Sequence, residues 1–250
     1  MPISGSGYAD VISDFVREVP VSQRDNVRDA AGRIATALRN DGVIQAFGSG
    51  HSEAIAMEIA GRAGGLVPTN RLTLRDLVIF GGEPPSILDN PGLERDPAIA
   101  HRIFELAKVA PPDIFVVISS SGVNGCVVEL ARIAKEQGHD VIALTSLRHS
   151  AAVPSRHPSG LKLSDLADVV LDNGAPRGDS VMHLPGGGAF GAVSTITSAL
   201  LAQMTVAEVV RLLLEAGQTP AVYLSANIPE GDEHNQRLEA RYAGRIRRGA

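Results

Sequence analysis

Three consecutive serines followed by a glycine are the most chemically suggestive feature of the sequence, in the stretch ISSSGVNG at 118–125. The stretch follows an apolar run and precedes a segment with helical spacing. Backbone amides at a helix N-terminus favour an anion, hydroxyl groups add neutral donors, and glycine lets the backbone approach a ligand closely. A serine-capped helix start is the simpler alternative, but three serines exceed what a cap requires. The stretch predicts a phosphate-binding loop without lysine or metal, formed by Ser119, Ser120, Ser121, Gly122 and Asn124.

A second loop with small polar residues is GSGHSE at 48–53. It lacks the third glycine of a dinucleotide-binding G-x-G-x-x-G loop, so a Rossmann cofactor site is not expected. We expect this loop to form another wall of the same pocket. No cofactor and no metal are expected, because the spacing of the histidines matches no zinc pattern. This loop adds Ser49, Gly50 and Ser52 to the predicted pocket. The end of a third predicted strand, LTS at 144–146, adds Thr145 and Ser146.

Proton transfer on a sugar needs a carboxylate or an imidazole at the pocket. Glu58 is flanked by apolar residues, and a partly desolvated carboxylate is a stronger base. A salt bridge from Glu58 to Arg62, four residues on, is an alternative of equal weight. His51 lies in the second loop and is either a catalytic ring or part of the wall. His234, near a predicted helix start in GDEHN, is the third candidate.

Apolar runs that alternate with helical patterns predict the elements that position these residues. Near-continuous apolar runs are typical of buried parallel strands, and parallel α/β folds bind ligands beyond the carboxyl ends of their strands. The fold class is therefore α/β, a three-layer α/β/α sandwich in a single domain, 1–250. The predicted strands are at 42–47, 113–118, 140–145 and 167–173, and the predicted helices at 23–40, 52–64, 96–109, 126–138 and 195–217.

The ends of the chain are predicted to be helical extensions of this domain. Residues 1–41 form the N-terminal extension, 42–217 the sandwich core, and 218–250 a C-terminal loop and helix. Gly42 is expected to end the first extension in a left-handed cap. The glycine-rich stretch 174–194 is expected to be a connection before the last long helix.

The composition excludes several classes of protein. Hydrophobic residues make up 44% of the 250 residues, aromatic residues only 4%, and tryptophan is absent, so the core must be aliphatic. A net charge of −5 gives no electrostatic basis for nucleic-acid binding. The N-terminus shows no signal-peptide pattern, and no apolar run is judged unbroken enough to span a membrane. With a single cysteine, Cys126, we expect a cytoplasmic protein without nucleic-acid or membrane partners.

The loops GSGHS, SSSGVNG and LTS, each after a predicted strand, resemble those of the sugar isomerase (SIS) domain. The longer segments GSGHSEAIAMEIAGRAGG, ALTSLRHSAAVPSRHPSG, ADVVLDNGAPRGD and SANIPEGDEHN resemble a group of stand-alone bacterial SIS proteins labelled phosphosugar or phosphoheptose isomerases. The resemblance implies a five-stranded parallel sheet of flavodoxin-like order and a phosphate held by the serine loop. It also implies a homodimer or homotetramer whose neighbouring subunit completes the active site.

One feature departs from the sedoheptulose 7-phosphate isomerases, whose family pattern places a catalytic histidine in the last long helix. The helix at 195–217 contains no histidine, and its polar candidates are Gln203 and Glu208. The leading prediction is aldose–ketose isomerisation of a phosphorylated sugar, with Glu58 as base and His51 or His234 assisting. The alternatives are an etherase of the N-acetylmuramic acid 6-phosphate type, which uses a glutamate, and a non-catalytic phosphosugar-binding regulator.

Overall fold

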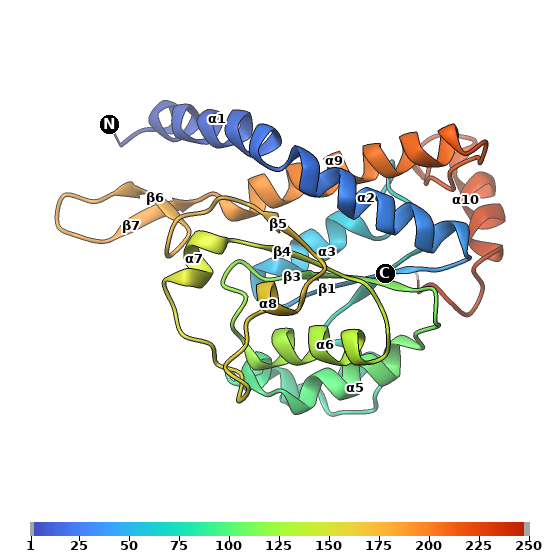
Figure 1. Cartoon of the computed structure of the whole chain (residues 1–250), viewed down its shortest axis with the longest axis horizontal. Helices are drawn as coiled ribbons and strands as arrows, with labels where there is room; N and C mark the ends of the chain where they lie inside the picture. The colour runs from blue at the N-terminus through green and yellow to red at the C-terminus, as the bar shows by residue number, and fades with distance from the viewer. Residues whose placement is uncertain (1–2, 248–250) are drawn as a thin grey trace.

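A five-stranded parallel sheet lies at the centre of the computed structural model, which describes residues 3–247 (Figure 1). Its strands are β1 (Ile44–Gly48), β2 (Thr69–Leu72), β3 (Ile114–Ile118), β4 (Val141–Thr145) and β5 (Val169–Asp172). The strand order β2-β1-β3-β4-β5 is flavodoxin-like, which confirms the predicted sheet. The outermost residues of the two predicted extensions, 1–2 and 248–250, lie outside the described part.

Helices cover both faces of the sheet and complete the predicted three layers (Figure 1). One face packs against α2 (Arg24–Arg39), α3 (Glu53–Ile59) and α9 (Ser194–Glu215), and the other against α5 (Ala98–Ala107), α6 (Gly125–Glu136) and α8 (Leu163–Leu166). The remaining helices are α1 (Gly5–Ser22), α4 (Asp76–Ile79), α7 (Leu147–Ala151) and α10 (Gly231–Ala240), with short 3₁₀ turns at η1 (Gly50–Ser52), η2 (Pro85–Asp89) and η3 (Leu93–Arg95).

The alternation of side chains along β3 explains why the central strands are apolar throughout. Ile114, Val116 and Ile118 pack with α2 and α9, whereas Phe115 and Val117 pack with α5 and α6. Successive side chains of a strand point to opposite faces, so a strand covered on both sides needs apolar residues at every position. Burying these two faces is the main source of stability of the fold.

Helix α9 corrects the expectation that no apolar segment is long enough to span a membrane. Its 22 residues meet that criterion by length and composition, with a mean hydropathy of 1.4 over 18 residues. Its charged residues lie in its second half, where Arg211 pairs with Glu208 and Glu215, and the Thr205 hydroxyl donates to the carbonyl of Leu201 within the helix. In this fold Leu201, Val209 and Leu213 lie in the core between α9 and the sheet.

Some elements lack the sequence signal that predicted the others. Strand β2 reads TNRL and is polar, but Asn70 is buried because it donates to Gln45 and to the carbonyl of Arg245. The connection at 174–194 contains a two-stranded antiparallel hairpin, β6 (Ser180–His183) with β7 (Ala189–Ala192), which extends away from the sheet (Figure 1).

The end of α2 differs from the prediction at one residue. Asp41, with φ 60°, takes the left-handed conformation expected of Gly42. Gly42 is required for a different reason, because a Cβ there would lie 2.2 Å from the carbonyl oxygen of Pro112. The glycine therefore allows two chain segments to approach at the start of β1.

A buried carboxylate joins this start of β1 to two other segments. Asp113 Oδ1 accepts hydrogen bonds from the Val43 amide at 2.9 Å and from Arg245 Nη2 at 2.5 Å. Its Oδ2 accepts from Gln45 Nε2 at 2.9 Å and from the Ala110 amide at 3.0 Å. The Asp113 side chain is 0% exposed, so all four donors depend on this single group.

Asp113→Asn is expected to lower the free energy of unfolding by about 3 kcal/mol, because an amide nitrogen would face donors and the buried ion pair would be lost. Urea denaturation measures the change. Asp25→Asn, at a side chain 94% exposed, is the matched control and should stay within about 0.5 kcal/mol of the native chain. Equal stability of the two variants would contradict the central role of Asp113.

Candidate functional site

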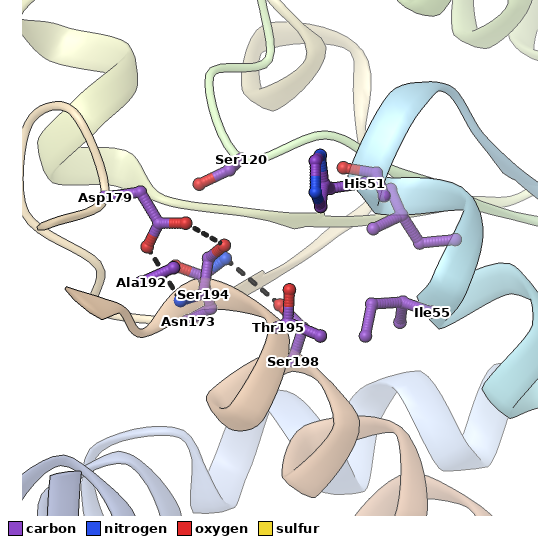
Figure 2. A pocket seen from close by; sticks show the side chains of 11 residues that line it. His51, Ile55, Ser120, Asn173, Asp179, Ala192, Ser194, Thr195 and Ser198 are labelled. Atoms are coloured by element: carbon purple, nitrogen blue, oxygen red, sulfur yellow. Dashed lines mark hydrogen bonds between the residues drawn. The ribbon is translucent and has the colours of Figure 1, made fainter. Parts of the chain in front are cut away.

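A cavity of about 270 Å³ opens at the carboxyl edge of the sheet, where polar loops were predicted to meet (Figure 2). Its walls come from the start of α3, from the ends of β3 and β5, from the base of the β6–β7 hairpin and from the first turns of α9. The lining residues are His51, Ser52, Ile55, Ile118, Ser120, Asn173, Asp179, Ala192, Ser194, Thr195 and Ser198.

Ser120 has an unused hydroxyl at this cavity. Its Oγ is buried and has no hydrogen-bond partner among the described residues, and its side chain points into the cavity (Figure 2). The Ser120 carbonyl is held by the Ser146 amide at 3.0 Å and by Thr145 Oγ1 at 3.3 Å. A buried hydroxyl without a partner is unfavourable, so an oxygen atom of a ligand would stabilise this position.

Gly122 shapes the loop behind Ser120. Its φ is 65°, and a Cβ at this position would lie 3.1 Å from Thr145 Oγ1. Its amide donates to Ser119 Oγ at 3.1 Å, so the Ser119 hydroxyl serves the loop itself. A residue with a side chain would be strained in this conformation and crowded against β4.

Asp179 lies on the hairpin side of the cavity, where it caps α9 from outside the helix (Figure 2). Its Oδ1 accepts from the amides of Val193 at 3.1 Å and Ser194 at 2.7 Å, and its Oδ2 accepts from Ser194 Oγ at 2.6 Å. These bonds satisfy amides at the positive end of the helix dipole. They also fix the base of the hairpin to the cavity.

Neutral donors and acceptors make up most of the remaining wall. Asn173 is buried, donates to Ser198 Oγ at 3.1 Å and accepts from the Ala175 amide at 3.0 Å. Asp179 is the only carboxylate among the lining residues, which include no lysine or arginine. Such a cavity can bind hydroxyl groups and a phosphate through neutral hydrogen bonds, with His51 as its one imidazole.

Two side chains in α6, behind the serine loop, have strongly shifted pKa values. Hydrogen bonds from Arg132, then from His157 and His101, lower the pKa of Glu129 to about 2. Burial raises the pKa of the Cys126 thiol to about 12. The Glu129–His157 contact of 2.8 Å anchors the loop that brings Arg156 to Asn124. The neutral Cys126 thiol is a packing group and not a nucleophile.

Comparison with known proteins identifies the family of the chain. The sequence profile of the SIS domain matches residues 7–146. A UPF0309 protein of Listeria monocytogenes is 41% identical over 243 residues, covering 97% of this chain and 98% of its own length. A UPF0309 protein of Geobacillus kaustophilus is 36% identical over 240 residues, covering 96% and 94%. The chain belongs to the UPF0309 family of SIS-domain proteins.

Solved structures share the fold of this SIS-domain protein. The phosphoheptose isomerase GmhA of Neisseria gonorrhoeae matches with a TM-score of 0.54 and 21% identity, covering 81% of this chain and 95% of its own. A phosphoheptose isomerase of Francisella tularensis matches with a TM-score of 0.54 and 16% identity, covering 82% and 95%. At these identities the similarity establishes the shared architecture.

The predicted site residues of the SIS-domain protein fall into separate groups in the structure. His51, Ser52 and Ser120 line the cavity. Ser146 instead caps α7, where its Oγ accepts from the His149 amide at 2.9 Å and donates to the Ala175 carbonyl at 2.6 Å. The other residues of the predicted loops lie outside the lining of this cavity, and they are Ser49, Gly50, Ser119, Ser121, Gly122, Asn124 and Thr145.

The structure places two of the predicted proton-transfer residues away from this cavity. The Glu58 carboxylate forms the alternative salt bridge with Arg62 and accepts from Gln203 Nε2 at 2.7 Å. His234 lies on α10, where its Nε2 contacts the carbonyl of Val222 at 3.0 Å. Helix α10 lies at the opposite end of the molecule from the hairpin, so His234 and His51 do not meet within one chain (Figure 1).

The residues on the hairpin side of the cavity were not predicted. Asn173 ends a predicted strand, Asp179 lies within the stretch that the sequence indicated only as a connection, and Ser194, Thr195 and Ser198 begin a helix predicted for its apolar character. The sequence could have indicated Asn173, because it ends the predicted strand ADVVLDN at the same edge of the sheet as the serine loops.

Asp179→Ala is expected to lower the free energy of unfolding by about 2 kcal/mol. The change removes the α9 cap and places alanine at a φ of 56°, each costing about 1 kcal/mol. Asp179→Asn is the matched variant, because asparagine tolerates this conformation and can cap, and its loss should stay below about 1 kcal/mol. Thermal denaturation followed by circular dichroism measures both, and equal losses would contradict the capping role.

Proposed function

We propose that this SIS-domain protein binds a phosphorylated sugar in the cavity and interconverts its aldose and ketose forms. The observation that carries the proposal is a wall of hydroxyl and amide groups with one unsatisfied hydroxyl, on Ser120, beside one imidazole, on His51. Membership of the SIS family and the fold shared with two phosphoheptose isomerases support the substrate class.

The polarity of the cavity suggests how the ligand is oriented. Its phosphate would bind at Ser120 and Ser52, whose hydroxyl groups are neutral donors. The sugar hydroxyls would then reach Asn173, Ser194 and Thr195, whose amide and hydroxyl groups can both donate and accept. A volume near 270 Å³ lies at the lower end of typical ligand cavities, which fits a single monosaccharide.

The chemistry proposed for His51 is proton transfer through an enediol. A neutral imidazole removes the proton from C2 of the aldose, and the electron pair forms the C1–C2 double bond as O1 gains a proton. The imidazolium returns its proton to C1 while O2 loses a proton, which gives the ketose and restores the neutral ring. Imidazole is the usual general base at neutral pH.

Glu58 and His234 remain predicted catalytic residues that require a second copy of the chain or another conformation to reach a ligand in the cavity. We propose that the protein self-associates as a homodimer or homotetramer. Exposed apolar side chains on α1 and α9 support this proposal: Val16, Val21, Ile196 and Leu214 are 38%, 66%, 39% and 59% exposed.

Ser120→Ala is expected to weaken sugar-phosphate binding at least tenfold, because a hydrogen bond to a charged group contributes about 1.5–3 kcal/mol. Isothermal titration with glucose 6-phosphate, glucosamine 6-phosphate and sedoheptulose 7-phosphate measures the affinity. Ser13→Ala, at an exposed serine of α1, is the control and should bind as the native chain does. Unchanged affinity in Ser120→Ala would place the phosphate elsewhere.

His51→Asn is expected to slow exchange of the C2 proton by about 10²–10⁴-fold, the usual contribution of a general base. The measurement is NMR of the bound sugar phosphates in deuterated water, with Glu58→Gln in parallel. Loss of exchange only in Glu58→Gln would assign the base to Glu58. Absence of exchange in the native protein would favour a binding regulator, and release of lactate from N-acetylmuramic acid 6-phosphate would favour an etherase.

A further inference from the structure

The two predicted phosphate loops share a carboxylate that the sequence did not indicate, Glu94 in η3. Glu94 Oε2 accepts a hydrogen bond from Ser49 Oγ at 3.0 Å, and Oε1 accepts from Asn124 Nδ2 at 2.8 Å. Ser49 follows β1 and Asn124 precedes α6, so one side chain joins both loops. Two of the donors that were predicted to bind the ligand therefore already bind an anion of the protein itself.

Glu94 forms no direct ion pair. Within the described residues, no lysine, arginine or histidine nitrogen lies within 4.0 Å of its carboxylate. Arg156 donates to Asn124 Oδ1 at 3.1 Å, so its guanidinium is joined to Glu94 only through the Asn124 amide. An unneutralised carboxylate repels a second anion over several ångströms, and more strongly in a partly buried site than in water.

Glu94 does not line the cavity, but it lies next to a loop that does. A Cβ on Gly50 would lie 3.9 Å from Glu94 Oε2, and the next two residues, His51 and Ser52, line the cavity. One turn of backbone therefore separates the carboxylate from the proposed ligand. Gly50, with φ 57°, allows the chain to make that turn.

We propose that Glu94 is a specificity-determining residue that excludes the phosphate of the ligand from Ser49 and Asn124. The phosphate is thereby directed to Ser120 and Ser52, which line the cavity and include the unsatisfied Ser120 hydroxyl. This inference rests on the proposed function and deepens it, because it selects one of two possible phosphate seats. The carboxylate also disfavours ligands with a second anionic group near Ser49 and Asn124.

The test compares Glu94→Gln with the native chain by isothermal titration, using glucose 6-phosphate, glucosamine 6-phosphate, sedoheptulose 7-phosphate and inorganic phosphate. Glu94→Gln removes the charge and preserves the shape, so sugar-phosphate affinity is expected to rise about tenfold. Glu94→Asp keeps the charge and should show no gain. Glu83→Gln, which removes a carboxylate bonded to Arg102, is the matched control and should leave the affinity unchanged.

The outcomes separate this inference from the proposed function. Binding by the native chain with equal or weaker binding by Glu94→Gln would overturn the role of Glu94 and leave the function intact. If only Glu94→Gln binds a sugar phosphate, the Glu94 charge prevents binding in the native chain, which would support the proposal. Absence of binding in every variant would overturn both. Glu94→Ala, which removes charge and hydrogen bonds together, replaces Glu94→Gln if melting curves show that the latter does not fold.

Discussion

A parallel sheet covered on both faces brings all of its carboxyl ends to one edge, and the rest of this structure depends on that constraint. The apolar side chains of β1, β3 and β4 are committed to the two cores, so polar chemistry is confined to the residues that follow each strand. The loops after β1, β3 and β5 meet there although more than a hundred residues separate the first from the last. The position of the cavity between these loops is therefore determined by the strand order of the parallel sheet.

Asp179 and Glu94 are carboxylates near this edge, and the chain satisfies each with its own donors. Asp179 binds the N-terminal amides of α9, and Glu94 binds Ser49 and Asn124. Between them lie hydroxyl and amide groups without lysine or arginine. In the proposed complex, neutral donors would bind the anionic ligand, and Glu94 would exclude it from Ser49 and Asn124. The proposed phosphate seat is therefore at Ser120.

Helix α9 connects the stability of the core to the shape of the site. Its apolar side chains pack against α2 and the sheet, while Ser194, Thr195 and Ser198 in its first turns line the cavity. The Asp179 cap joins the start of this helix to the base of the β6–β7 hairpin, so hydrogen bonds connect the hairpin to a helix of the core. The same helix is apolar enough to meet the criterion for a membrane span, which shows that composition alone does not reveal where such a segment packs.

The sequence by itself determined the α/β class, four of the five sheet strands and the polar loops at their ends, because near-continuous apolar runs have few other stable arrangements. It did not locate β2, whose polar residues are buried only through partners such as Gln45 and the C-terminal segment. Among the predicted pocket residues, tertiary structure separated Ser120 and Ser52, which face the cavity, from Ser49 and Asn124, which bind Glu94. It also brought Asn173 and Asp179 into the cavity lining. The physical reason is that local spacing determines which backbone conformation a residue adopts, whereas its hydrogen-bond partner depends on segments brought close only by the folded sheet.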